Sequence, residues 1–510
     1  MNAFKMQIVA GLAFVLIIAI IIGNISTPAM AASSLNREAT VSVAAGANHV
    51  LLLAPDGSLW AWGNNDKGEC GIDKSDNQMC VLKPVRVPLS NIKSIAAGSS
   101  FSMALKNDGT VWAWGDNHMG QLGIGAIDTD AHPTPIQVPE LTNIVSISVS
   151  GYTVMALRGD GTVWVWGEGT YGQLGDGEPY NGYSINADGS TSIIPKYKSS
   201  PVRVLNIDDV KVIFTNGVND FAVKNDNTLW GWGLNSSIFG ENSKNLNGAN
   251  CVLTPVSIHR LNNLKMVSHT PLVIFVSTNE GTIYGWGVDT NGLLGYSQGM
   301  GCVDVFTPVQ LNGLRNIESI MAGTTHAVAL ENDGTVWTWG ANHYGQIGNG
   351  KSGNYEVQVD PYVVPIRDIK VIAAGSLFTI AISEDGTIWG WGSNDHGELG
   401  DGSNGGVSSE DGVVQNKFYR SQPVMAAFNL TTLESNTLSR EESALIGANP
   451  NSTTSIQPSV TMWPYKEKEP YSDNSSDMVP DNMINISLLF GLLCVVAVAG
   501  GIILYLNHKK

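Results

Sequence analysis

A Trp-Gly dipeptide returns along the chain at a nearly constant interval, and this regularity constrains the fold more than any other feature. Of the 14 tryptophans in the 510 residues, 13 fall within these motifs, so tryptophan belongs to the repeat and not to one pocket. Self-similarity at such a period indicates a repeat architecture. Seven units cover roughly residues 41–427, with spacings of 52, 52, 66, 54, 53 and 52 residues. The motif glycines are Gly63, Gly115, Gly167, Gly233, Gly287, Gly340 and Gly392.

Each unit reads as a series of short strands joined by tight turns. In the second unit an apolar run ends in Ala-Ala-Gly, another covers residues 102–105, and Asp108-Gly109 precedes the aromatic run 111–115. Asp-Gly between apolar runs predicts a hairpin, because the turn requires positive φ angles that Asp tolerates and Gly adopts freely. Side chains alternate along a strand, so Trp112 and Trp114 share one face. The fold is therefore expected to be all-β.

A closing strand opened by proline follows the loop after each Trp-Gly motif. Proline suits the start of a strand or an edge strand. The first unit has no such strand before it, and no unit follows the last one, so we expect the two ends of the array to complete one blade together. The prolines are Pro84, Pro135, Pro201, Pro255, Pro308, Pro361 and Pro423.

The Ala-Ala-Gly, Asp-Gly, Trp-x-Trp-Gly and Gly-Gln-Leu-Gly signatures together resemble those of the regulator of chromosome condensation repeat family. Seven such repeats imply a seven-bladed β-propeller over residues 41–427. WD repeats differ, since they run 40 to 45 residues with another dipeptide. Units four and five depart from the pattern at Asp226-Asn227, 238–240 and Tyr284, so we expect those blades to be less regular but present.

The two ends of the chain predict a membrane protein. Residues 1–32 have the basic start, apolar run and small residues of a signal peptide, although an uncleaved anchor is the alternative. Residues 486–506 form a charge-free stretch long enough for one transmembrane helix, and the Lys-Lys after it predicts a cytoplasmic tail at 507–510. Residues 428–485 have the composition of a flexible Ser/Thr/Asn/Pro stalk. We therefore expect a single-pass protein of the cell membrane with its propeller outside.

Four cysteines fall in the part of the chain expected outside the membrane, where disulfides persist. Four cysteines allow three pairings. We favour Cys70 with Cys80, which share one loop, and Cys251 with Cys302, which occupy matching positions before the closing strands of blades four and five. Unpaired buried thiols are the alternative.

Composition and motifs argue against several functions. A net charge of −17 leaves no basic surface for a nucleic acid, so no nucleic-acid partner is expected. The chain has no serine elbow, His-Glu-x-x-His, phosphate loop or Cys-x-x-Cys, so we expect a non-enzyme without cofactor. The family's eukaryotic namesake acts as an exchange factor for a small GTPase, but a propeller outside the cell would not meet one.

The loop after each Trp-Gly motif offers a ring of polar and aromatic side chains on one face of the propeller. A metal would need several ligands within about 2.0–2.2 Å of one ion, and separate blades spread them apart, so no metal is expected. Loops on a rigid scaffold suit contact with a partner instead. The ring comprises Asp66, His118, Thr170, Thr290, His343 and Asp395, with Lys67, Met119, Tyr171, Asn291, Tyr344 and His396 beside them.

The connections before the closing strands of blades three and seven are the longest. They span 176–200 and 401–422, and they carry Tyr180, Tyr183, Tyr197, Phe418 and Tyr419. Protruding tyrosines favour recognition of a protein or a sugar. The alternative is a surface insertion without function.

Two histidines, His49 and His326, follow the Ala-Gly turn at a position that Phe101, Val154 and Phe378 fill elsewhere. Packing near the hub of the propeller is the expected role of both.

These features lead to three hypotheses of function. The first is a cell-surface recognition module that binds an extracellular protein, with secreted propellers of the same family as precedent. The second is lectin-like binding of an envelope or extracellular polysaccharide, which requires the motif tryptophans to be exposed. The third, a polysaccharide-active enzyme, requires two carboxylates about 5–9.5 Å apart in a cleft, and no pair is evident.

Overall fold

A computed structural model describes residues 41–73, 79–178, 183–185, 191–193, 195–234, 238–239, 251–260, 264–295, 303–353, 356–404, 406–410 and 413–430. The chain divides into two units, Met1–Ile446 and Gly447–Lys510, and every described residue belongs to the first. The predicted signal peptide, the transmembrane helix and almost all of the stalk lie outside the described residues. Within those residues, no helix has the length and apolar character to cross a membrane.

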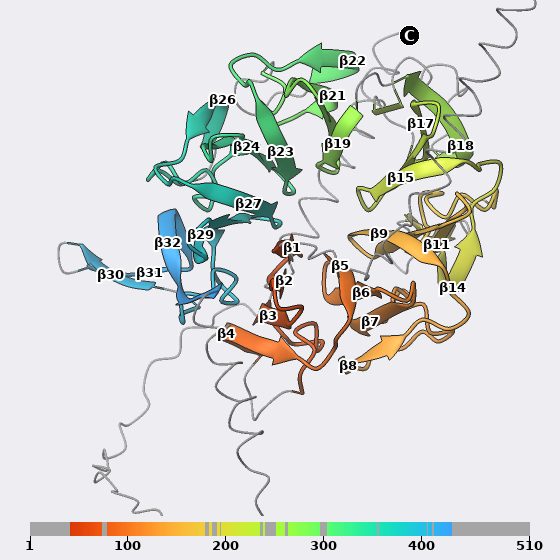
Figure 1. Ribbon diagram of the computed structural model, residues 1–510, viewed down its shortest axis with the longest axis horizontal. Coiled ribbons are helices and arrows are strands. Elements are labelled where there is room, and N and C mark those ends of the chain that lie inside the picture. Colours follow the sequence, from red (N-terminus) through yellow and green to blue (C-terminus); the bar gives the residue numbers. More distant parts are fainter. Residues whose placement is uncertain are drawn as a thin grey trace, which may run out of the picture. The chain divides into compact units, whose positions relative to one another are not determined.

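Seven four-stranded antiparallel sheets surround a common axis, as the sequence predicts (Figure 1). Blade 1 holds β1 (Ser42–Ala45), β2 (His49–Leu53), β3 (Leu59–Asn64) and β4 (Cys80–Val87). Blade 2 holds β5 (Ile92–Ala97), β6 (Phe101–Lys106), β7 (Val111–Gly115) and β8 (His132–Gln137). Blade 3 holds β9 (Ile144–Ser150), β10 (Thr153–Arg158), β11 (Val163–Glu168) and β14 (Tyr197–Arg203). Blade 4 holds β15 (Val210–Thr215), β16 (Asn219–Lys224), β17 (Thr228–Leu234) and β18 (Cys251–Arg260).

The remaining blades follow the same order. Blade 5 holds β19 (Leu264–His269), β20 (Val273–Thr278), β21 (Ile283–Asp289) and β22 (Val303–Gln310). Blade 6 holds β23 (Ile317–Ala322), β24 (His326–Glu331), β25 (Val336–Ala341) and β26 (Val357–Val363). Blade 7 holds β27 (Ile369–Ala374), β28 (Phe378–Ser383), β29 (Thr387–Ser393) and β32 (Tyr419–Asn429). Blades 4 and 5 thus have all four strands, as expected.

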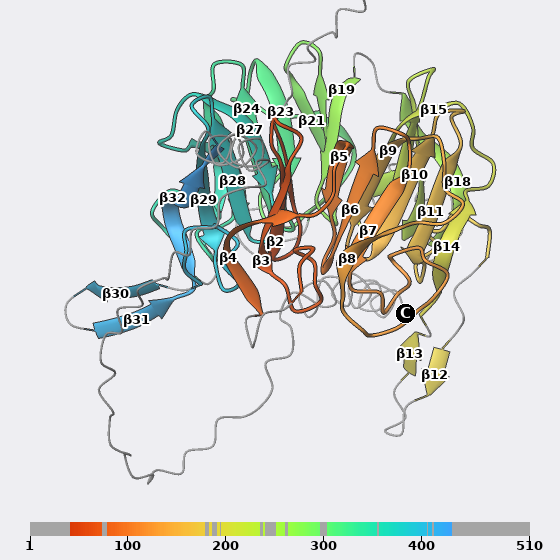
Figure 2. The same ribbon diagram turned by 60° about the horizontal axis from the view of Figure 1, so that its bottom comes forward.

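Two additional hairpins are inserted between the third and fourth strands of blades 3 and 7. They are β12 (Tyr183–Ile185) with β13 (Thr191–Ile193), and β30 (Gly406–Glu410) with β31 (Val413–Lys417). Figure 2 shows both hairpins extending from the lower edge of the blades. The long connections expected in blades 3 and 7 are therefore built as protruding hairpins.

The second tryptophan of each motif forms a wedge between neighbouring blades. Every one of these seven side chains is buried, and its indole Nε1 donates to a backbone carbonyl of the preceding blade at 2.7–3.0 Å. Indole burial supplies a large apolar contact, and the hydrogen bond satisfies its polar edge. The pairs are Trp62–Glu398, Trp114–Glu69, Trp166–Gln121, Trp232–Gln173, Trp286–Ile238, Trp339–Leu293 and Trp391–Gln346.

The prediction that the two ends complete one blade together is wrong. Blade 1 is built entirely from β1 to β4, and the last strand, β32, joins β27 to β29. The strand at Ser42–Ala45 is itself an innermost strand, so each of the seven units already contains four strands. The ring closes between blades instead, where Trp62 donates to Glu398 O and Gly402 N donates to Leu82 O at 3.2 Å.

In blades 1 to 4, the turn before the motif also hydrogen-bonds to the first tryptophan of that motif. In blade 1, Asp56 Oδ1 accepts from the backbone N and Oγ of Ser58, and Ser58 Oγ accepts from Trp60 Nε1 at 2.7 Å. The same relay recurs in blades 2, 3 and 4. Blade 4 keeps the turn because Asn227, with φ 68°, takes the place of glycine. These first tryptophans are half-buried.

Candidate partner-binding surface

The Trp-Gly loops all leave the third strand at the same end of the propeller, which we call the loop face. The motif glycine is required there: Gly63 has φ 102°, and a Cβ on it would lie 2.4 Å from the Asn48 carbonyl oxygen. Only glycine adopts this conformation without strain. The loops therefore start from a fixed backbone position.

An asparagine two residues after the motif glycine organises each of four loops, a feature that the reading of the sequence missed. Its Oδ1 accepts from the backbone N five residues later at 3.0–3.2 Å. Its Nδ2 donates to the far side of the same loop. The signal in the sequence was Trp-Gly-x-Asn, which occurs at Asn65, Asn117, Asn235, Asn342 and Asn394; Asn235 lies outside the described residues.

A Gln or Glu that follows the loop glycine holds the backbone of the candidate contact residue through a hydrogen bond. Gln121, Gln173 and Gln346 accept through Oε1 from the backbone N two residues earlier at 2.8–2.9 Å. Glu69 and Glu398 make the same bond in blades 1 and 7 at 2.9 Å. These internal hydrogen bonds fix the loops of blades 1, 2, 3, 6 and 7, which therefore suit the display of side chains to a partner.

Two of the predicted contact residues meet at the junction of blades 6 and 7, and a third is adjacent to them in the chain. The rings of Tyr344 and Tyr419 meet edge to face with centroids 6.5 Å apart, and Ser352 Oγ donates to Tyr419 Oη at 3.1 Å. Phe418, next to Tyr419, is 49% exposed. We call Tyr344, Phe418 and Tyr419 the aromatic patch.

His118 and His396 are tied into the surface by carboxylates. His118 Nδ1 bonds to Asp116 Oδ2, and its ring meets Tyr152 of blade 3 edge to face at 4.8 Å. His396 Nδ1 lies 3.3 Å from Glu398 Oε1, and this hydrogen bond raises the pKa of His396. Each histidine keeps about a third of its side chain exposed. Both remain available for contact, at fixed positions.

The other predicted contact residues are dispersed around the ring. Tyr171 and His343 are half-buried, and this burial raises the pKa of Tyr171 and lowers that of His343. Tyr197 is 41% exposed at the start of β14. Tyr183 starts β12, and its side chain lies outside the described residues. In the described part of the chain, no three His, Cys, Asp or Glu side chains are placed to hold a metal ion.

The predicted disulfide between Cys70 and Cys80 is not formed in this structure, where Cys70, Cys80 and Cys251 are free thiols. Cys70 is buried, and its Sγ lies 3.2 Å from the Asn64 carbonyl oxygen, to which the thiol donates. Burial raises the pKa of both the Cys70 and the Cys80 thiols, which lowers their reactivity. Cys302, the predicted partner of Cys251, lies outside the described residues.

The two hub histidines bond across blades, as their expected packing role requires. His49 Nε2 lies 2.9 Å from Ser102 Oγ, and Ser102 Oγ donates to Glu69 O at 2.7 Å. Since that hydroxyl proton is used, His49 must donate through Nε2. His326 and Thr379 repeat the pair between blades 6 and 7 at 3.0 Å. Burial lowers the pKa of His49 to about 3 and that of His326 to about 4.

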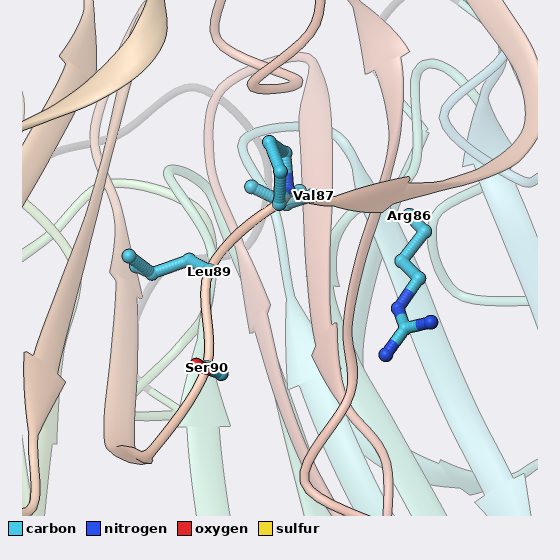
Figure 3. A pocket seen from close by; sticks show the side chains of 5 residues that line it. Arg86, Val87, Leu89 and Ser90 are labelled. Atoms are coloured by element: carbon cyan, nitrogen blue, oxygen red, sulfur yellow. The ribbon is translucent and has the colours of Figure 1, made fainter.

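A surface hollow of about 340 Å³ lies away from these residues. It is lined by Arg86, Val87, Pro88, Leu89 and Ser90 on the connection between blades 1 and 2 (Figure 3). A single short segment forms it, with no convergence of polar groups from several elements. It does not have the features of a ligand site.

Sequence comparison identifies the repeats. The RCC1-like domain matches residues 21–270. The regulator of chromosome condensation (RCC1) repeat matches residues 280–330 and 333–382, and a second description of the same repeat matches 317–346 and 369–398.

Two relatives show where such repeats occur. The chain is 28% identical over 357 residues to the human E3 ubiquitin-protein ligase HERC2, covering 68% of this chain but only 7% of that protein. It is also 28% identical over 376 residues to the Arabidopsis thaliana ultraviolet-B receptor UVR8, covering 72% of this chain and 69% of that protein.

Solved structures share the fold. Yeast RCC1 (Prp20), crystallised with Kap60, is 23% identical with a TM-score of 0.54, covering 68% of this chain and 80% of that one. Human WBSCR16 is 18% identical with a TM-score of 0.56, covering 73% and 95%. This chain thus carries regulator of chromosome condensation repeats folded as a seven-bladed β-propeller.

Proposed function

We propose that the propeller is a non-catalytic recognition module that binds a protein partner through its loop face, with the aromatic patch as the principal contact. The observation that carries this proposal is the exposed Phe418 beside the Tyr344–Tyr419 pair. Aromatic side chains in a rigid setting are enriched where protein interfaces concentrate their binding energy. The hydrogen-bonded loops beneath the patch limit the entropy that binding would cost.

Precedent among similar structures supports a protein partner. Yeast RCC1 was crystallised bound to Kap60, and Prp20p is described by its binding properties to Gsp1p and histones. Proteins are thus the partners named for these propellers. For this chain we propose that the partner is an extracellular protein, bound by a propeller that the stalk holds outside the cell membrane. This placement rests on the predicted segments 1–32 and 486–506 alone.

The lectin-like alternative requires exposed tryptophan rings on which a sugar could stack, and the motif tryptophans do not provide them. Stacking a sugar on the motif tryptophans needs exposed indole faces, but the second tryptophan of every motif is at most 1% exposed. The described first tryptophans are half-buried, and those of blades 2, 3 and 4 have Lys106, Arg158 and Lys224 over their rings. A polysaccharide would have to bind through other groups.

Photo-crosslinking from the patch tests this function. A benzophenone amino acid at position 418 of the full chain should capture a discrete protein, and Tyr344→Ala should reduce the yield about tenfold. Position 425 is the matched control, because Met425 is 62% exposed on β32, the strand that begins directly after Phe418, but lies outside the patch. Equal capture from both positions, or binding of a glycan array in place of a protein, would contradict the proposal.

A further inference from the structure

Blades 3 and 7 share an arrangement of charges that blades 1 and 6 lack. In both, an aspartate follows the Leu-Gly of the repeat, and a lysine or arginine lies opposite the motif glycine. The aspartates are Asp176 and Asp401, and the opposing cations are Lys198 and Arg420. Both blades also carry an inserted hairpin, which these residues flank in the chain.

The charges form an ionic clasp at the root of each hairpin. In blade 7, Arg420 Nη2 lies 3.0 Å from Asp401 Oδ2 and donates to Ser403 Oγ at 2.9 Å. In blade 3, Asp176 Oδ1 accepts from Lys196 Nζ at 2.9 Å, with Lys198 3.9 Å from the other oxygen. Lys196 is only 5% exposed. Burial from water strengthens such pairs relative to surface ion pairs.

The corresponding positions are neutral in blades 1 and 6, whereas in blade 2 His132 lies opposite the motif glycine and pairs with Asp128 at 2.8 Å, so a lysine or arginine clasp distinguishes blades 3 and 7. Blade 6 has Asn349 and Gln358, whose side chains lie 3.5 Å apart, and blade 1 has Ile72 and Val81. Blade 6 shows that the neutral pair keeps the rest of the loop, because Asn349 Oδ1 still accepts from Asn342 Nδ2 and Lys351 N. Loop folding alone therefore does not require the charges.

An exposed aromatic residue accompanies each clasp. Tyr197 lies opposite Glu168 in blade 3, and Tyr419 lies opposite Ser393 in blade 7, so the two tyrosines are equivalent in the repeat. Tyr197 is 41% exposed, and Phe418 beside Tyr419 is 49% exposed. Between these two blades, the rims of blades 1 and 2 present polar side chains such as Lys67 and His118.

We propose that blades 3 and 7 each present a recognition arm, consisting of the clasp at the root of the inserted hairpin and the exposed aromatic residue beside that clasp, and that one protein partner contacts both arms. This inference rests on the proposed function, since it assumes a protein on the loop face. The partner is a folded protein that spans blades 1 and 2, with apolar contacts at its two ends and polar contacts between them. Engaging two arms at once raises affinity through effective concentration.

The clasp is tested without any partner by amide hydrogen exchange on the full chain. The double substitution Asp401→Asn with Arg420→Gln installs the pair that blade 6 uses. Loss of the charge-assisted bonds should raise exchange in β30 and β31 by about five- to tenfold while blade 6 is unchanged. Unchanged exchange in the hairpin would overturn the role of the clasp. Asp401→Asn alone is the harsher variant, because it leaves Arg420 half-buried without its counter-ion.

The two-arm arrangement is tested by crosslinking with a benzophenone amino acid at position 197 and, separately, at position 418. Both positions should capture the same protein, as identified by mass spectrometry. Tyr197→Ala should lower the yield from position 418 by about tenfold, while Met425→Ala should leave it unchanged. Capture of different proteins, or a yield from 418 that ignores Tyr197→Ala, would overturn the two-arm inference and leave the proposed function intact. Capture from neither position would refute the proposed function itself.

Discussion

Trp62 in blade 1 donates its indole Nε1 to the carbonyl oxygen of Glu398 in blade 7 at 2.8 Å, although 336 residues separate the two along the chain. This bond closes the ring at the position where six equivalent bonds join the other blades. The ring is therefore closed by the second motif tryptophan, the same kind of contact that joins the other blades, and no strand is shared between the two ends of the propeller.

Removing the Trp62 donor should weaken this closure. Trp62→Phe keeps a ring in the wedge but leaves the buried Glu398 carbonyl without its indole partner, which costs about 1–3 kcal/mol. The free energy of unfolding from urea titration measures the loss. The matched control is Trp60→Phe, whose half-buried indole bonds only to Ser58 Oγ and should cost less than about 1 kcal/mol. Equal losses for both variants would contradict a special role for the closing wedge.

The hub histidines should make the protein acid-sensitive. Burial lowers the pKa of His49 to about 3 and that of His326 to about 4, below their ordinary value of 6.5. Below pH 6.5 the unfolded chain takes up protons that the folded protein does not, so stability falls by up to about 1.4 kcal/mol per pH unit for each histidine.

Replacing these histidines isolates their effect. His49→Phe with His326→Phe introduces the residue that Phe101 and Phe378 provide at the same position in blades 2 and 7. The variant should lose less stability than the wild type between pH 6.5 and pH 4, as measured by urea titration at each pH. Parallel pH profiles would show that the histidines ionise freely in the folded protein.

Glu69 should lower the free energy of unfolding as the pH rises from 4.5 toward 8. Burial, followed by the charge of nearby Asp66, raises the pKa of Glu69 from 4.5 to about 8. The stabilising protonated form is fully present below pH 4.5, and stability falls as pH rises toward 8, because the unfolded chain ionises first. Glu69→Gln, the residue of blades 2, 3 and 6, should therefore gain stability over the wild type as pH rises through this window.

The equivalent change in blade 7 provides the control. Glu398 bonds to the side chain of His396, so Glu398→Gln removes a charge-assisted bond and should lower stability. Thermal unfolding of both variants at pH 5 and pH 8 distinguishes the two glutamates. A gain from Glu398→Gln comparable to that from Glu69→Gln would contradict the assignment.

Asp220 is expected to be a neutral carboxylic acid in the folded protein. It is fully buried, neither carboxyl oxygen has a hydrogen-bond partner among the described residues, and burial raises its pKa well above the ordinary value. The same position holds Ser102 in blade 2 and Thr379 in blade 7, which donate to the carbonyl that also binds the wedge tryptophan.

Substitution by the residue of blade 2 tests this state. Asp220→Ser should be more stable than the wild type by at least about 1 kcal/mol at pH 9, because it removes a buried group that resists ionisation. The advantage should shrink at pH 5, where the unfolded chain also protonates the aspartate more readily. Urea titration at the two pH values measures it, and a difference independent of pH would contradict a neutral Asp220.

The regular parts of the fold followed from the sequence because they depend on local chemistry. Asp-Gly turns, alternating tryptophans and proline-led strands each act within a few residues, and seven repetitions reinforce them. The error at the chain ends had a different origin: the last proline-led strand was expected to pair with the first unit, but β32 pairs with β29 of its own unit, and β1 pairs with β2. The predicted disulfide failed because sharing a loop does not set the direction of the Cys70 side chain.

The sequence predicted that the candidate contact residues form a ring on one face, but not which of them meet. Equivalent repeat positions placed Tyr344 and His396 on one face, but the pairing of Tyr344 with Tyr419 depends on how a loop of blade 6 meets the outer strand of blade 7. The loop-organising asparagines were visible in the sequence as Trp-Gly-x-Asn. The clasps could not be predicted from the sequence, because they depend on the positions of side chains that lie about 20 residues apart in the chain.

Hydrogen exchange of the full chain, alone and with the protein captured from position 418, tests the central claim most directly. Binding through the loop face predicts protection at residues 343–344 and 418–420 and none at the hairpin turns of the opposite face, around Asp108 and Asp333. Protection at those turns, with none at the aromatic patch, would contradict it.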